Sequence, residues 1–228
     1  MLRLGGPRCP PALLLVLMLV VVVASGRGAQ ECLERAVSTS GELELLPERG
    51  EHFPPFPREW KSVEWKVRRG EGKWKRILTA WKDGRVSYTG GSFPGGVVFQ
   101  PETLSLRISP VREEDKGVYK VEFEDPSGIV THLSFCVSVW DPIPWADLQA
   151  QTLPWEQGWC NISLSCSVPA PGNVSYVWKC SGDPPGALGH PQPRLFLQVP
   201  VDGGATICLC NVSNPVSWSS ASADIVAL

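Results

Sequence analysis

The sequence predicts an all-β protein made of two tandem immunoglobulin-like sandwiches, a V-type domain followed by a C2-type domain. Short runs of alternating apolar and polar residues recur between turn residues, and apolar residues at helical spacing are scarce. The 228 residues include 10 tryptophans and 8 cysteines, which are unusual numbers for both types. A tyrosine-corner motif in the first half and a Cys–Trp–Cys pattern in the second are typical of immunoglobulin domains.

The first residues are expected to be a secretory signal peptide, residues 1–26. Arg3 and Arg8 precede an apolar run over residues 12–24, and small residues follow it. The run is shorter than the roughly 20 residues of a membrane-spanning helix, although an uncleaved anchor is the alternative. No later apolar run is long, so membrane attachment is not encoded in the predicted mature chain. We therefore expect a secretory-pathway protein, at the cell surface if a longer form supplies an anchor and otherwise secreted.

The V-type domain is predicted over residues 30–140. The spacing from Leu106 through Asp115 to Tyr119 matches the approach to the immunoglobulin tyrosine corner, and Trp65 lies on an alternating strand about 55 residues upstream. Strand B, around residues 43–46, has no cysteine, and Val121 replaces the cysteine expected two residues after the corner tyrosine. Apolar packing around Trp65 should therefore hold this domain together without the usual bridge between sheets.

The C2-type domain is predicted over residues 145–228, after a proline-containing linker at residues 141–144. Here Cys166, Trp178 and Cys210 occupy the positions of the conserved bridge and its tryptophan. Closing a loop of about 45 residues stabilises the fold by roughly 3–4 kcal/mol in the chain-entropy model.

The other cysteines are assigned from strand geometry, in an oxidising compartment that favours disulfides. Cys180 and Cys208 each lie two residues from an inward-facing core residue on neighbouring strands, which suggests a cross-strand bridge. Cys32 near strand A and Cys136 on strand G can also pair, because these strands run side by side in V-type sandwiches. Zinc is the alternative ligand, but the cysteine spacings do not form the usual paired-knuckle pattern, and no metal is expected.

Three Asn-x-Ser sequons are candidate glycosylation sites, and all of them fall in the second predicted domain. They are Asn161, Asn173 and Asn211. Asn214 is discounted because proline follows it. Residues 30–140 contain no sequon, so one whole domain is expected to be free of N-linked glycan.

Charge and motif content argue against several functional classes. The net charge of −2 removes the general electrostatic argument for nucleic-acid binding. No nucleophile elbow, zinc-protease motif or phosphate-binding loop occurs, so neither enzymatic activity nor a cofactor is expected. Seven basic residues between Lys61 and Arg76 form a local concentration of charge. A solvated strand face explains this run as well as a binding role does, and heparin or nucleic-acid binding is a weaker alternative.

The chain resembles the SLAM (signalling lymphocytic activation molecule) family of the immunoglobulin superfamily. The resemblance covers residues 30–228 and is carried by residues 210–218 (CNVSNPVSW), 172–178 (GNVSYVW) and 77–84 (ILTAWKDG). In that family a cysteine at the position of Cys160 pairs with one just after strand G. The resemblance therefore implies that Cys160 lacks its partner here and that the sequence is a truncated or alternatively ended product.

The resemblance also implies where a partner would bind. In the family, the front sheet of the first domain docks a V-type immunoglobulin domain of a family member, either the same protein or a different one, on an apposed cell. Side-chain alternation on strands C and F places a set of charged residues outward on that sheet. The expected partner-binding residues are Glu64, Lys66, Arg68, Lys75, Lys120, Glu122 and Glu124. The two functions to be distinguished are a tethered adhesion receptor or ligand and a secreted decoy of the same family.

Overall fold

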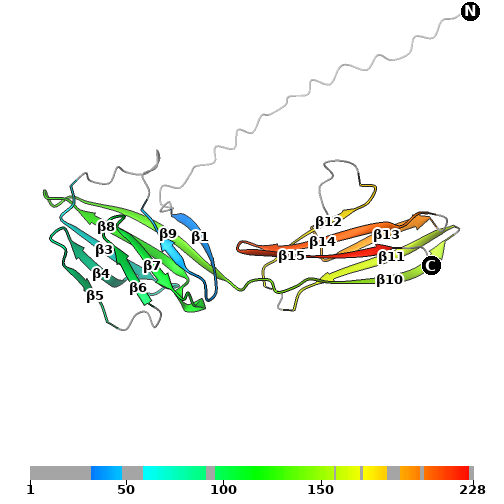
Figure 1. The fold of residues 1–228 in the computed structure, drawn as a ribbon, viewed down its shortest axis with the longest axis horizontal. Helices are drawn as coiled ribbons and strands as arrows, with labels where there is room; N and C mark the ends of the chain where they lie inside the picture. The colour runs from blue at the N-terminus through cyan, green and yellow to red at the C-terminus, as the bar shows by residue number, and fades with distance from the viewer. Residues whose placement is uncertain are drawn as a thin grey trace, which may run out of the picture. The chain divides into compact units, whose positions relative to one another are not determined.

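The computed structural model describes residues 32–47, 59–90, 96–156, 158–169, 172–183, 191–200 and 203–225, so the predicted signal peptide lies outside the described residues. The fold class is the predicted one: the described elements are β-strands apart from one short 3-10 helix, and they form two successive groups, β1–β9 and β10–β15 (Figure 1). Within these ranges, no helix is long and apolar enough to cross a membrane.

The first sandwich pairs a six-stranded sheet with a three-stranded one. The larger sheet has the order β1-β9-β8-β3-β4-β5 and the smaller has the order β2-β7-β6. β1 runs parallel to β9 and the other neighbours are antiparallel. The strands are β1 (Leu33–Ser38), β2 (Leu43–Leu45), β3 (Ser62–Arg68), β4 (Lys75–Trp81), β5 (Val86–Tyr88), β6 (Gly96–Gln100), β7 (Ser105–Ser109), β8 (Gly117–Glu124) and β9 (Val130–Trp140). This order is that of a V-type immunoglobulin domain.

Strand alternation builds the core of the first sandwich around Trp65. On β3, the side chains that alternate with the polar ones are almost fully buried, and the Trp65 ring stacks on Phe135 of β9 with 5.8 Å between centroids. The Trp65 indole N–H donates to the Leu104 carbonyl at 3.2 Å, so its polar atom is satisfied in the core. Leu45 and Val121, which stand where bridge cysteines are usual, are 0% exposed.

The predicted tyrosine corner is present at the turn before β8. A short 3-10 helix, η1 (Glu113–Asp115), precedes it, and the Tyr119 hydroxyl donates to the Asp115 carbonyl at 2.7 Å. The Asp115 carboxylate accepts hydrogen bonds from Arg69 at 3.1 Å and from the Arg112 backbone N–H at 2.9 Å. Burial raises the pKa of Tyr119 well above its usual range. The corner therefore joins η1, Arg69 and β8 through hydrogen bonds to Asp115.

The second sandwich has two three-stranded sheets, β10-β11-β13 and β12-β14-β15. Its strands are β10 (Asp147–Glu156), β11 (Trp159–Ser167), β12 (Ser175–Cys180), β13 (Arg194–Pro200), β14 (Thr206–Asn214) and β15 (Ser217–Ile225). All pairings are antiparallel. In immunoglobulin nomenclature, β10, β11 and β13 are strands A, B and E, and they face β12, β14 and β15, which are strands C, F and G. This is the predicted C2-type arrangement.

The structure forms the three disulfide pairs named from the sequence. Cys166–Cys210 joins the two sheets of the second sandwich, with 6.5 Å between Cα atoms. Cys180–Cys208 joins directly opposite residues of β12 and β14 at 4.1 Å, and Cys32–Cys136 ties the start of the first sandwich to β9 at 5.6 Å. Cys160 is a free thiol, buried in the core of the second sandwich.

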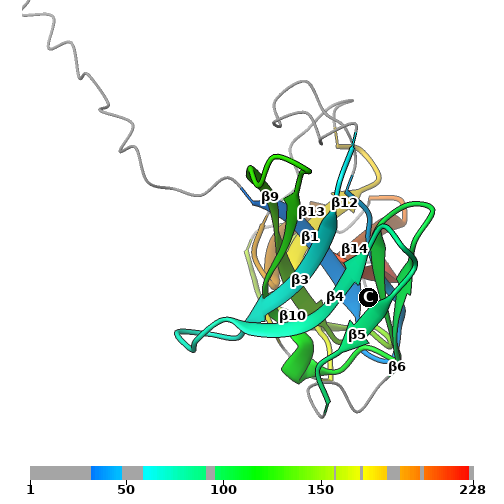
Figure 2. The ribbon, with the colours of Figure 1, turned by 90° about the vertical axis from the view of Figure 1, so that its left-hand side faces the viewer.

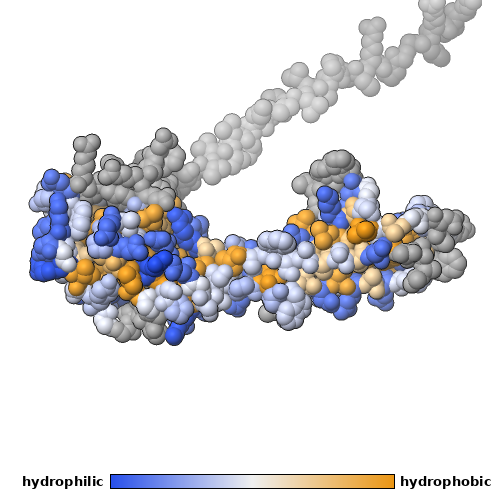
Figure 3. Space-filling model, viewed as in Figure 1, coloured by the Kyte–Doolittle hydropathy of each residue, from blue (hydrophilic) through white to orange (hydrophobic). Residues whose placement is uncertain are grey.

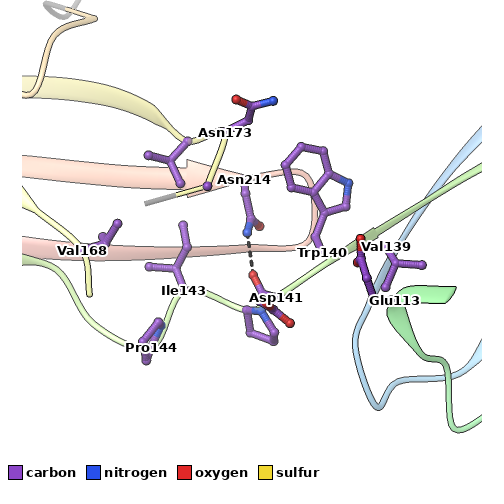
Figure 4. A pocket seen from close by; sticks show the side chains of 12 residues that line it. Glu113, Val139, Trp140, Asp141, Ile143, Pro144, Val168, Asn173 and Asn214 are labelled. Atoms are coloured by element: carbon purple, nitrogen blue, oxygen red, sulfur yellow. Dashed lines mark hydrogen bonds between the residues drawn. The ribbon is translucent and has the colours of Figure 1, made fainter. Parts of the chain in front are cut away.

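Asn214 anchors the segment that connects β9 to β10. Its side-chain amide donates to the Asp141 carbonyl at 2.8 Å, as Figure 4 shows, and its side-chain oxygen accepts from the backbone N–H groups of Val216 and Ser217. The Ser217 hydroxyl in turn accepts the Ile143 N–H at 2.8 Å. The residue discounted as a glycan acceptor therefore organises the β14–β15 turn and holds the linker. The predicted boundaries at residues 140 and 145 remain predictions.

Candidate recognition face on the first sandwich

The outward side chains of β3, β4 and β8 form a continuous charged surface, which we call the front face. Its members are six of the predicted partner-binding residues and Arg76, together with Lys61 and Trp74, which immediately precede β3 and β4; the six are Glu64, Lys66, Arg68, Lys120, Glu122 and Glu124. Figure 2 shows β3, β4 and β5 side by side in this sheet. β3 and β8 alternate: Val63, Val67 and the other inward residues are buried, while the charged residues between them stay half-buried or exposed. On β4 the alternation is interrupted by a register shift, where Ile77 and Leu78 are both buried.

Four of the predicted residues form one ion-pair network in the middle of the front face. The Glu122 carboxylate pairs with the ammonium groups of Lys66, at 2.7 Å, and Lys120, at 2.6 Å. The Lys66 ammonium also lies 3.2 Å from the Glu64 carboxylate. In the β3–β8 register, Lys66 lies opposite Lys120 and Glu64 lies opposite Glu122. Like charges directly opposite one another are unfavourable, so the favourable contacts are diagonal or along one strand. The network thus depends on all four residues together.

The pKa values of the network report this pairing. Burial alone would raise the pKa of Glu122, but hydrogen bonds from Lys120 and Lys66 outweigh burial and hold the pKa below its usual value. Burial alone would lower the pKa of Lys66, but hydrogen bonds to Glu122 and Glu64 outweigh it and raise the pKa. Both groups are therefore charged at neutral pH, and each is held in place by its partners.

Trp74 adds an aromatic platform that the sequence reasoning missed. The Arg68 guanidinium lies 4.9 Å from the centroid of the Trp74 ring, and the Lys120 ammonium lies 4.7 Å from it. Cations at these distances are attracted to the ring face. Trp74 precedes β4 and lies within the basic run from Lys61 to Arg76, where a tryptophan among lysines was the available signal. It links Arg68, on β3, to the network on β8.

The two remaining predicted residues, Glu124 and Lys75, lie outside the central network. Glu124 pairs with Lys61 at 2.7 Å and accepts a hydrogen bond from Ser62 at 3.0 Å, separately from the central network. Lys75 is exposed at the start of β4, but it lies opposite the buried Val67, so the register places it on the inward side of the sheet and not on the front face, contrary to the prediction. The structure thus brings five predicted residues together, leaves Glu124 at the edge of the front face and separates Lys75 from it.

The three sequons and one metal-like grouping lie elsewhere. Asn161 is on β11, Asn173 is in the turn before β12 and Asn211 is on β14. Cys32, Glu34 and Cys136 place potential ligand atoms within 4.8 Å of one another, but the two sulfurs are bonded in a disulfide. Glycosylation of the three asparagines stays a prediction.

Two sandwiches in the order V-type then C2-type, with a charged front sheet on the first, define a protein of the immunoglobulin superfamily. The fold is similar to that of murine CEACAM1b, with a TM-score of 0.62, 17% sequence identity, and coverage of 85% of this chain and 98% of that one. At this identity the likeness shows the fold alone.

Sequence comparison identifies the family. A family model described as natural killer cell receptor 2B4 matches residues 55–141. The human natural killer cell receptor 2B4 is 31% identical over 220 residues, which cover 90% of this chain and 55% of that protein. The human CD48 antigen is 24% identical over 123 residues (54% and 48%), and the dog signaling lymphocytic activation molecule is 31% identical over 131 residues (54% and 37%).

The chain belongs to the SLAM family of the immunoglobulin superfamily. The relatives are immunoglobulin-type immune receptors and not enzymes. The chain spans about half to two-thirds of the length of the 2B4 relatives, at 55%, 64% and 51% of the human, rat and mouse proteins.

Proposed function

We propose that this chain is an extracellular leukocyte recognition protein that binds a V-type immunoglobulin domain of a SLAM-family protein on another cell. The contact surface is the front face of the first sandwich. The observation that carries the proposal is the ion-pair network of Glu64, Lys66, Lys120 and Glu122, with Trp74 beside it.

The network is a preorganised set of charges. Its side chains are only 19–30% exposed, which is low for lysine and glutamate, so little side-chain freedom remains to be lost on binding. Each lysine ammonium has three donors and each carboxylate has about four acceptor positions, so the internal contacts leave donors and acceptors for a partner. A partner with opposite charges in matching positions would be selected, and like charges would be rejected.

The glycan pattern supports the same surface. All three sequons lie in the second sandwich, so the front face carries no N-linked acceptor that could cover it. The polar character of the face favours a weak, transient contact, with avidity from many copies across a cell junction. The similarity to a protein named as a natural killer cell receptor, over 90% of this chain, is consistent with a recognition role.

The test is binding of multimerised residues 27–228 to cells that display each SLAM-family ectodomain in turn. The variant carries Lys120→Glu together with Glu122→Lys. Because residue 120 lies opposite Lys66, this exchange leaves opposite charges across β3 and β8 and should preserve folding. We expect binding to one family member and its loss, by at least about tenfold, in the exchanged variant, as is usual for interfacial charge pairs.

The matched control exchanges charges on the other sheet of the same sandwich. Glu42 and Arg107 form an ion pair there at 2.5 Å, and Glu42→Arg with Arg107→Glu leaves the front face untouched. Binding should be retained in this control. If both exchanges reduce binding equally, or if no family member binds, the front face is not the recognition surface.

The same contact would serve a tethered receptor or ligand and a secreted decoy. The two roles differ in whether the native protein stays on the producing cell. Surface staining of cells that express the endogenous gene, compared with the protein in their medium, separates them.

A further inference from the structure

The outer face of the β10-β11-β13 sheet exposes two large aromatic residues. Phe196 is 66% exposed and Trp159 is 49% exposed. In the β11–β13 register, Trp159 lies opposite Pro200, Asn161 opposite Gln198 and Ser163 opposite Phe196. Because alternate residues of a strand point to the same face, Trp159, Asn161 and Phe196 share one surface. Figure 3 shows hydrophobic residues at the surface of the second sandwich.

A hollow of about 470 Å³ lies in this surface, beside the exposed Phe196 side chain. Its lining is largely apolar, apart from two amides, and consists of Leu153, Pro154, Asn161, Ile162, Phe196, Leu197 and Gln198. A concave, mainly apolar surface with a few fixed polar groups is the usual form of a small-ligand site. The acceptor asparagine of a sequon is itself part of the lining.

The Asn161 side chain is held in a defined orientation at the edge of this hollow. Its Nδ2 donates to the Pro154 carbonyl at 2.9 Å, and its Oδ1 accepts from the Gln198 amide at 3.0 Å. An asparagine amide nitrogen has two hydrogens, and one suffices for the bond to Pro154. The second hydrogen is the one a sugar would replace, so glycosylation is compatible with both contacts.

We propose that the first sugar of an N-linked glycan on Asn161 occupies this hollow and packs on the ring of Phe196, with Trp159 on the far side of the acceptor. Transfer from a lipid pyrophosphate oligosaccharide forms the bond from Nδ2 to the anomeric carbon and breaks that carbon's bond to the phosphate oxygen. One Nδ2 hydrogen leaves as a proton, and the lipid pyrophosphate is the leaving group.

A sugar ring and the Phe196 side chain have complementary surfaces. A pyranose ring presents C–H groups on its flat faces, and an aromatic ring presents a negative face and a large apolar area. Covering the exposed Phe196 ring removes apolar surface from water, which stabilises the folded sandwich. The glycan then shields an aromatic patch that would otherwise promote association. This inference is independent of the front face and of any partner bound there.

The test is a double-mutant cycle on the full chain secreted from mammalian cells. Ser163→Ala removes the sequon but leaves the Asn161 side chain in place, and Phe196→Ala removes the aromatic platform. Glycopeptide mass spectrometry should find Asn161 occupied in the wild type. Ser163→Ala should then lower the melting temperature of the second sandwich by about 4 °C, the shift expected when a domain of this size loses one good contact.

The decisive quantity is whether the effect of Ser163→Ala on the melting temperature depends on Phe196. In the Phe196→Ala background, removal of the sequon should shift the melting temperature by less than about 1 °C, because the sugar has no ring to cover. Ser175→Ala removes the Asn173 sequon on the other sheet and should act equally in both backgrounds. An equal effect of Ser163→Ala in both backgrounds, or an unoccupied Asn161, would overturn the proposal.

A second readout locates the contact along the glycan. Endoglycosidase trimming to a single N-acetylglucosamine should keep the melting temperature of the wild type, because the first sugar makes the contact. A trimming step that lowers the melting temperature as much as Ser163→Ala does would contradict this placement.

Light scattering tests the shielding of the aromatic surface. The Ser163→Ala variant should self-associate, and adding Phe196→Ala should prevent this. If the fully glycosylated protein associates through Phe196, the aromatic surface binds a second copy of the chain instead of the sugar.

Discussion

The two sandwiches of this chain hold their two sheets together in different ways. Among its described residues, the first has no disulfide between its sheets and fills the space with large side chains, of which Trp65, Tyr119, Phe123 and Phe135 are almost completely buried. In the second, Cys166–Cys210 and Cys180–Cys208 cross-link the strands. There, Leu164 is the one residue among the largest fully buried side chains described.

The comparison teaches that a bridge and an apolar core are alternative supports for one architecture. Buried apolar area stabilises the folded state, whereas a disulfide mainly restricts the unfolded chain. At equivalent positions the first sandwich has Val121 and Tyr119 where the second has Cys210 and Cys208. Four predictions follow this comparison, in order of decreasing effect.

The largest effect is expected from Trp65→Ala. Truncating a fully buried tryptophan leaves a cavity and should lower the free energy of unfolding of the first sandwich by about 3–5 kcal/mol. Hydrogen exchange measured peptide by peptide during urea unfolding would follow each sandwich separately. The second sandwich should be unchanged, and Trp178→Ala should reverse the pattern. Equal loss in both sandwiches for Trp65→Ala would show that they do not fold independently.

Removing the bridge between the sheets tests the other support. Cys166→Ala with Cys210→Ala opens a loop whose ends are 44 residues apart in sequence. Because Cys180–Cys208 remains within that loop and shortens it, the chain-entropy model gives a loss of about 3 kcal/mol, in the second sandwich alone. Peptide-level hydrogen exchange during urea unfolding would measure this loss of stability. A loss below about 1 kcal/mol would mean that Cys180–Cys208 and the remaining core suffice, and that the comparison overstates the role of the bridge.

Tyr119→Phe sharpens the comparison at the corner position. The variant keeps the ring but removes the hydroxyl that donates to the buried Asp115 carbonyl. An unsatisfied buried carbonyl should lower the free energy of unfolding of the first sandwich by about 1–2 kcal/mol. Tyr176→Phe in the second sandwich is the matched control, because Tyr176 is only partly buried, and should stay within about 0.5 kcal/mol. Chemical unfolding of both variants would reveal whether the corner bond matters.

The smallest effect is the pH dependence of the front face. The pKa of Glu122 is lowered from 4.5 in the folded state, so its contribution to stability is present above pH 4.5 and is lost as the pH falls through the folded pKa. Glu122→Gln should therefore lower the stability of the first sandwich by about 0.5 kcal/mol at pH 7, as expected for a partly exposed pair. At pH 3 the difference from the wild type should shrink. A difference that is the same at both pH values would show that Glu122 acts through packing rather than charge.

Much of the candidate site followed from strand periodicity. Alternation around Trp65 and Tyr119 was enough to place Lys66 and Lys120 outward on one sheet, because a two-residue period fixes the face. The choice of contacts did not follow, because the register sets like charges opposite each other and the favourable pairs are diagonal. Trp74 lies outside any strand, so periodicity gave no information about its position.

The sequence by itself determined the fold class, the inward and outward faces of the strands and the pairs of cysteines that could meet, because these depend on local period and on strand adjacency. The tertiary structure decided the rest. It made Glu122 the centre of the network, placed Trp74 under two cations, gave Asn214 its hold on the linker and set Asn161 beside Phe196. Each of these contacts joins residues on different elements, and the register and packing that bring them together arise only when the whole domain is folded.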